Sequence, residues 1–171
     1  MIKTLGTRLE ELPGRPETGR WLHLTAGDPV SGAVELIELM EHGGRFNPPK
    51  AFPVAYFAED SKSCRSQLNR WLQKEPEADR FTVLIAEMQL SKVLDLDDAA
   101  VRRRVGISMA DLVDQSSWDL SQSIGAAARR AGFLGVIYPR PRGAGGLNLA
   151  AFCDRTSSQE INIVGAGHCT P

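Results

Sequence analysis

An arginine beside two glycines is the clearest candidate for chemistry in this sequence. Arg45 follows those glycines and precedes Phe46, Asn47 and two prolines, in the segment 43–49. Its guanidinium is planar, carries five N–H donors and matches the oxygens of a phosphate. The glycines let a ligand approach the backbone closely, and the prolines stiffen the chain. These features favour a phosphate or pyrophosphate site at Arg45; the alternative is a surface-loop arginine with Phe46 stacked beside it.

The other residues that commonly carry chemistry form no recognisable motif. The histidines and cysteines are His23, His42, His168, Cys64, Cys153 and Cys169. They show no H-x-x-x-H or C-x-x-C spacing, so we expect neither a metal site nor a disulfide framework. The sequence has no G-x-S-x-G turn for a serine nucleophile. The glycine-rich residues 143–146 are not followed by Lys-Ser or Lys-Thr, as a phosphate-binding loop would require.

Length and charge restrict the class of protein. The chain has 171 residues, the size of one domain, with 20 basic and 21 acidic side chains and a formal net charge of -1. This balance argues against a nucleic-acid-coating protein and makes binding through the arginines at 102–104 and 140–142 the weakest alternative. No run approaches the roughly 20 apolar residues of a membrane helix, and no long apolar signal opens the chain. We therefore expect a cytoplasmic protein that contacts neither nucleic acid nor membrane.

The pattern of apolar residues, glycines and prolines predicts strands mixed with helices. The expected strands are 21–24, 54–58, 80–88, 134–138, 147–152 and 161–164. The expected helices are 1–12, 33–41, 61–72, 97–105 and 117–131. Trp71 and Trp118 are expected to pack in the core, because helical spacing places each among apolar residues. The elements lack the regular rhythm of a parallel sheet, so the predicted fold class is α+β, a compact mixed sheet with flanking helices.

Two further blocks complete a pattern with the Arg45 segment. Tyr56 lies eleven residues after Arg45 in Val54-Ala-Tyr-Phe-Ala-Glu-Asp60, and a late block runs from Ala131-Gly-Phe-Leu-Gly to Gly146-Leu-Asn-Leu-Ala-Ala-Phe152. In this order the blocks resemble the RES domain, the toxin half of a bacterial toxin–antitoxin pair. The family shows G-G-R-[WF]-N-x-P, then Y-x-[AS]-E, then A-G-F-x-G and G-x-N-L-x-x-F. The resemblance spans 21–152, and we expect an N-terminal arm with a short helix at 1–20, a RES-like domain at 21–165 and a tail at 166–171.

The resemblance implies a fold like that of ADP-ribosyltransferases, with a cleft that binds NAD as substrate and no permanently bound cofactor. Family members cleave the nicotinamide–ribose bond by hydrolysis, phosphorolysis or ADP-ribosyl transfer. By motif, Arg45 would hold the NAD phosphates, with Phe46 and Asn47 beside it, and Tyr56 would stack on or orient the nicotinamide or its ribose. The family also implies an Xre-type helix-turn-helix antitoxin as partner, in a homodimer or a larger toxin–antitoxin assembly.

Two positions depart from the family pattern. The family glutamate, eleven residues after the tyrosine, is Gln67 here, and the family serine after the proline of the late block is Arg140. Gln67 accepts a hydrogen bond but cannot offset the positive charge that develops on the ribose. Arg140 adds positive charge near NAD; it could strengthen the grip on the pyrophosphate or oppose the cationic transition state.

Three interpretations of these departures remain open. Glu59, three residues after Tyr56, could supply the missing carboxylate, although a glutamate there could simply be a first-turn helix acid. Arg140 could redirect the site to another acceptor or nucleotide. Alternatively, the protein is a degenerate relative that binds a nucleotide or a partner without turnover.

Overall fold

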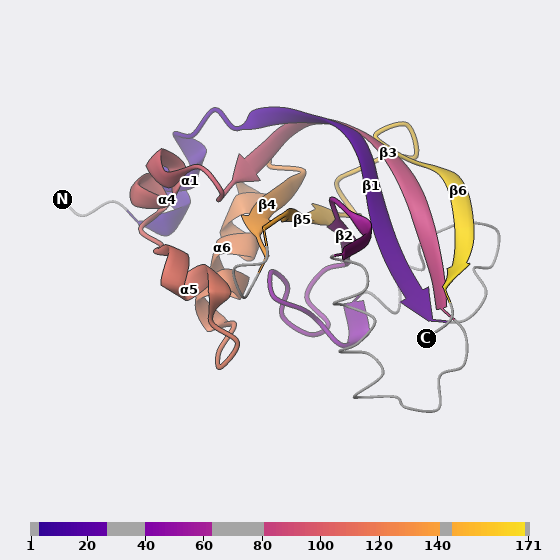
Figure 1. Cartoon of the computed structure of the whole chain (residues 1–171). Coiled ribbons are helices and arrows are strands. Elements are labelled where there is room, and N and C mark those ends of the chain that lie inside the picture. The colour runs from indigo at the N-terminus through magenta and orange to yellow at the C-terminus, as the bar shows by residue number, and fades with distance from the viewer. Residues whose placement is uncertain (1–3, 27–39, 63–80, 141–144, 170–171) are drawn as a thin grey trace.

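The computed structural model describes residues 4–26, 40–62, 81–140 and 145–169 (Figure 1). Nearly all of the expected helix at 33–41, and all but the first two residues of the one expected at 61–72, lie outside the described residues. Gln67 and Trp71 lie outside them too.

In the described ranges, six strands form one sheet, which closes because the first strand along the chain also pairs with the third. They are β1 Arg15–Ala26, β2 Val54–Ala58, β3 Phe81–Asp95, β4 Gly135–Pro139, β5 Leu147–Phe152 and β6 Ile161–Cys169. The order is β1-β2-β5-β4-β3-β6, and β1 also pairs with β3 along most of its length. The pairings are antiparallel except for that of β3 with β4. The short strands β2, β5 and β4 therefore form one layer, and the long strands β1, β3 and β6 form the other (Figure 1).

The short layer is buried on both faces because its side chains alternate between two cores. Phe57, Leu149 and Ile137 point towards the long strands and pack with Trp21 and Met88. The residues between them point to the opposite face, where the helices lie (Figure 1). The helix side of β2, β5 and β4 is the face on which the candidate site is built.

Among the described residues, four helices cover that face, each with local signals that begin or end it. They are α1 Leu5–Glu10, α4 Ala99–Val105, α5 Met109–Val113 and α6 Asp119–Arg130. Asp98 caps α4 with its carboxylate, and Gly106 ends it in the left-handed region at φ 85°. Ser108 and Asp111 form a capping box on α5. None of the helices in the described ranges is long and apolar enough to cross a membrane.

The predicted mixed sheet with flanking helices is confirmed, and strands 54–58 and 147–152 have the predicted bounds. Other bounds were wrong. β1 begins at Arg15, six residues before the predicted strand, and so runs through the boundary that we drew after residue 20. β3 continues to Asp95, and β6 to Cys169. The five-residue helix α5 was not predicted at all.

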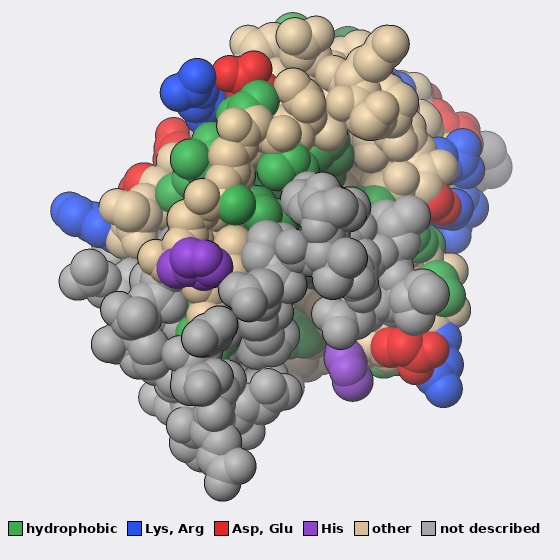
Figure 2. Space-filling view, turned by 90° about the vertical axis from the view of Figure 1, so that its right-hand side faces the viewer, with side chains coloured by type: hydrophobic (Ala, Val, Ile, Leu, Met, Phe, Trp, Pro, Cys, Tyr) green, Lys and Arg blue, Asp and Glu red, His purple; other side chains and the backbone are tan. Residues whose placement is uncertain are grey.

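The outer face of the long strands carries scattered charges rather than a basic patch. Figure 2 shows the side of the molecule towards β6, where basic side chains stand apart from one another and beside acidic ones. Arg20 of β1, for example, pairs with Glu87 of β3, with 3.1 Å between Nη2 and Oε1.

Candidate functional site

The segment that contains Arg45 is a tight turn locked by its own backbone. Gly44 donates its N–H to the carbonyl of Asn47 over 2.8 Å. Gly43 has φ 63°, a conformation that favours glycine, and a Cβ there would lie 2.8 Å from the Asn47 carbonyl oxygen. The turn drives Phe46 into the core, where its ring centroid lies 4.8 Å from that of Tyr138.

Tyr56 of β2 holds this turn through its hydroxyl group. The oxygen accepts a hydrogen bond from the Phe46 N–H and donates one to Asn47 Oδ1, both at 2.8 Å. Gly44 lies against the ring, since a Cβ there would be 2.6 Å from the hydroxyl oxygen. Burial, and next the neighbouring Tyr138, raise the pKa of Tyr56 well above its ordinary value. The phenol therefore stays neutral at physiological pH and positions the turn.

Helix α6 supports the same turn from the other side. A Cβ on Gly125 would lie only 1.9 Å from the Phe46 carbonyl oxygen, so no larger residue fits unless the turn or the helix shifts. Gln122, one turn earlier, donates from Nε2 to the Gly44 carbonyl over 2.9 Å. The turn is thus fixed between the sheet and α6.

Arg45 leaves this fixed turn towards the end of α5. Its Nη1 donates to the Leu112 carbonyl and its Nη2 to the Asp114 carbonyl, both at 2.8 Å. A cation is favourable there because the last carbonyls of a helix carry partial negative charge. The guanidinium carbon lies 5.9 Å from the ring centroid of Trp118. Arg45 is buried, whereas Trp118 beside it is 37% exposed.

A second polar cluster lies where β2 and β4 end and β5 begins. Arg140 is buried, and its Nη2 donates to Asp60 Oδ1 over 3.1 Å. Gly146 of the preceding loop lies between these two residues, and a Cβ there would be 2.6 Å from Arg140 Nη2 and 3.2 Å from Asp60 Oδ2. The missing side chain at Gly146 lets the two charged groups meet across β5, so the buried arginine has its counter-ion.

Glu59 adjoins this cluster but faces solvent. Its Oε2 accepts the Leu147 N–H over 2.9 Å, and its own N–H donates to the Leu147 carbonyl over 3.0 Å. The carboxylate is therefore held beside the first residue of β5. It remains accessible to a ligand because Glu59 is exposed.

The structure brings together four of the predicted site residues: Arg45, Phe46, Asn47 and Tyr56. Phe46 and Asn47 have no exposed surface, and Asn47 Nδ2 donates to the Phe52 carbonyl over 3.0 Å. In this structure both side chains therefore support the site from the core and do not line its surface. Gln67 cannot be placed, because it lies outside the described residues.

Two residues at the site were misjudged from sequence. Trp118 was expected to pack in the core, and this was wrong, because it is exposed beside Arg45. Asn148 was not among the predicted site residues, yet it is 3% exposed and its side chain lies on the helix side of β5. No local pattern separates either residue from a structural one.

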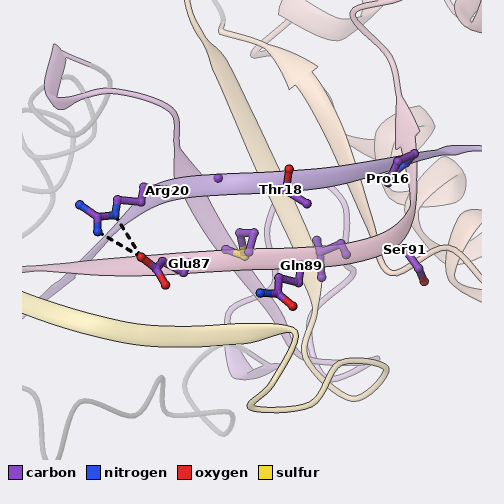
Figure 3. A pocket seen from close by; sticks show the side chains of 9 residues that line it. Pro16, Thr18, Arg20, Glu87, Gln89 and Ser91 are labelled. Atoms are coloured by element: carbon purple, nitrogen blue, oxygen red, sulfur yellow. Dashed lines mark hydrogen bonds and ion pairs between the residues drawn. The ribbon is translucent and has the colours of Figure 1, made fainter.

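A shallow groove lies elsewhere, over β1 and β3 (Figure 3). Side chains from both strands line it, among them Thr18, Arg20, Glu87 and Gln89. These side chains lie on the outer face of the long strands, so the inner core and the short layer separate the groove from Arg45 and Tyr56.

Comparison with known proteins points to one family. The family model for the RES domain matches residues 12–167. Proteins named NAD(+) phosphorylase MbcT, from Mycobacterium bovis and Mycobacterium tuberculosis, are 31% identical to the chain over 136 residues, or 75% of this chain and 72% of theirs. The crystal structure of the M. tuberculosis MbcT-MbcA toxin-antitoxin complex superposes with a TM-score of 0.83 at 26% identity. It covers 98% of this chain and 92% of that one.

Removal of the Tyr56 hydroxyl tests its role in holding the turn. We expect Tyr56→Phe to lower the free energy of unfolding by about 1–3 kcal/mol, because the Phe46 N–H and Asn47 Oδ1 both lose their partner. Urea denaturation of the variant and the unmodified chain measures this difference. Equal unfolding midpoints with equal slopes would show that the turn is held by other contacts.

Proposed function

The chain belongs to the RES domain family, and from this premise we propose that it cleaves NAD at the nicotinamide–ribose bond with inorganic phosphate as acceptor. The observation that carries the proposal is that the Tyr56 hydroxyl binds Phe46, the residue after Arg45, so two separate family motifs meet on the helix side of the sheet. The relatives named NAD(+) phosphorylase support phosphate as the acceptor.

The reaction separates charge in a way that this site can assist. The bond between C1 of the ribose and the pyridine nitrogen breaks, and its electron pair leaves with nicotinamide, which becomes neutral. The ribose passes through an oxocarbenium-like state, and a phosphate oxygen then forms the new bond to C1. A positively charged group on the pyrophosphate positions the substrate, and a carboxylate near C1 stabilises the developing cation.

Arg45 supplies the positive charge in this proposal. Its hydrogen bonds to the carbonyls of Leu112 and Asp114 fix the guanidinium through neutral acceptors, and the Asp114 carboxylate is the acid that interacts with its charge. Tyr56 orients the nicotinamide or its ribose through its ring, because its hydroxyl already bonds Phe46 and Asn47. Phe46 and Asn47 act as positioning residues behind Arg45.

The carboxylate role falls to Glu59, with Gln67 as a hydrogen-bond acceptor for a ribose hydroxyl. Glu59 is the exposed acid held next to β5, directly after the strand that carries Tyr56. Arg140 contributes to NAD binding from the end of β4, and its ion pair with Asp60 limits its opposition to the cationic transition state.

The proposal extends to the fold and the partner. The fold is ADP-ribosyltransferase-like, as the family resemblance implies. The activity is neutralised by an antitoxin of the Xre helix-turn-helix type that covers the cleft, in a homodimer or larger assembly. The superposition on the toxin-antitoxin complex of MbcT and MbcA supports an antitoxin as partner.

Nicotinamide release from NAD tests the proposed activity directly. We expect the purified chain to release nicotinamide, and release to accelerate with phosphate while ADP-ribose 1-phosphate accumulates. Chromatography of the products, with and without phosphate, measures both. NAD binding without nicotinamide release, with or without phosphate, would contradict cleavage and favour a relative that only binds. Equal release rates with and without phosphate, with ADP-ribose as the product, would show that water and not phosphate is the acceptor.

Gln67→Glu restores the family glutamate and tests how the site is completed. If Gln67 occupies the family position beside the ribose, the added carboxylate stabilises the cation and we expect turnover to rise by roughly 10²-fold. The matched control is Gln89→Glu on the outer face of β3, which adds the same charge away from the site. Unchanged or lower turnover in Gln67→Glu would contradict the placement of Gln67 beside the ribose and would leave the carboxylate role to Glu59 alone.

A further inference from the structure

Two buried polar atoms of the second cluster have no hydrogen-bond partner. They are Asn148 Oδ1 and Arg140 Nε, in residues that are 3% and 8% exposed. Across the described ranges, no other buried side-chain nitrogen or oxygen lacks a partner in this way. Buried polar groups almost always have a partner, so these two atoms, one on β5 and one directly after β4, mark a place for a small polar group of a water or a ligand.

The sheet register places these two residues side by side. Asn148 lies opposite Tyr138 of β4, and the Arg140 N–H bonds the Gly146 carbonyl, so Arg140 and Asn148 are diagonal neighbours. Diagonal neighbours on one face lie roughly 7–8 Å apart. Because Asn148 alternates with Leu149 of the inner core, its side chain is on the helix side, the face that also carries Tyr56.

The two orphaned atoms require a ligand that both donates and accepts. Arg140 Nε carries a hydrogen to donate, whereas Asn148 Oδ1 can only accept. The diphosphate of NAD offers acceptors alone, and any phosphate would also face the Asp60 carboxylate beside Arg140. A primary carboxamide offers a carbonyl oxygen and an N–H side by side in one plane, which matches the pair.

The surroundings favour a flat, positively charged ring as the carrier of that carboxamide. Tyr138 is the direct cross-strand neighbour of Asn148, and Tyr56 lies on the same face, so aromatic surface adjoins the pair. The ion pair with Asp60 offsets the charge of Arg140. The subsite therefore does not repel a pyridinium ring as a lone arginine would.

We propose that Asn148 and Arg140 form a subsite for the carboxamide of the nicotinamide ring, an inference that rests on NAD being the substrate. The Arg140 Nε–H donates to the carboxamide oxygen, and Asn148 Oδ1 accepts from its N–H. The subsite makes the enzyme selective for the carboxamide, and it fixes the ring with its nitrogen towards the reacting ribose.

A substrate that lacks only the carboxamide N–H tests this subsite. In 3-acetylpyridine adenine dinucleotide a methyl group replaces the amide nitrogen, and the positive ring and the carbonyl remain. The selectivity is the kcat/KM for NAD divided by the kcat/KM for the analogue. We expect this selectivity to be at least roughly tenfold higher in the unmodified chain than in Asn148→Ala. Differences in leaving-group chemistry are common to both proteins and cancel in this comparison. Asn162→Ala, an exposed asparagine of β6, is the matched control and should keep the original ratio.

The outcomes separate the subsite from the proposed function. No cleavage of NAD by the unmodified chain would reject the proposed function, and the subsite with it. Cleavage with the same substrate ratio in Asn148→Ala would overturn the subsite alone; an equal loss for both substrates would place Asn148 at a shared part such as the ribose. If Asn148→Ala does not fold, Asn148→Asp keeps the size and the acceptor. It should then retain the preference for NAD, and loss of that preference would also overturn the subsite.

Discussion

A single buried hydroxyl group fixes the part of the molecule on which the proposed activity depends. The Tyr56 hydroxyl uses its donor and its acceptor on one turn, bonding Asn47 Oδ1 and the Phe46 N–H. Gly44 makes the contact possible, since a side chain there would strike the ring. Because the turn is fixed, Arg45 leaves it in one direction, towards the last carbonyls of α5. The arginine is thus pre-organised, and binding of an anion does not have to immobilise it.

The neighbouring cluster shows how an arginine fits where the family has a serine. Gly146 leaves the space in which Asp60 and Arg140 meet across β5, so the guanidinium is buried with its counter-ion. A lone buried arginine would be costly and would repel a cationic ring, whereas the pair does neither. The departure at Arg140 is therefore compatible with NAD chemistry, and in the proposed subsite the orphaned Nε is the atom that contacts the substrate.

Sequence patterns predicted the parts of the structure that depend on local periodicity. The strands at 54–58 and 147–152 were predicted because apolar runs bounded by turn residues mark buried strands. The early start of β1 was missed because Pro16 suggests a break, although proline is tolerated in a strand where its missing N–H is not needed. The α5 helix has one buried side chain, Leu112, too few for a periodic signal. The hydrogen bond from Arg45 to the Leu112 carbonyl joins residues 67 positions apart, so no local sequence pattern predicts it.

Amide hydrogen exchange with and without NAD, in phosphate-free buffer, tests most directly whether substrate binds where this account places it. The account predicts slower exchange on NAD addition at 43–47, at 112–118 and at 146–148, with no change at 16–20 and 87–91, which line the outer groove. Protection confined to the groove, or nicotinamide release without protection around Arg45 and Asn148, would contradict it.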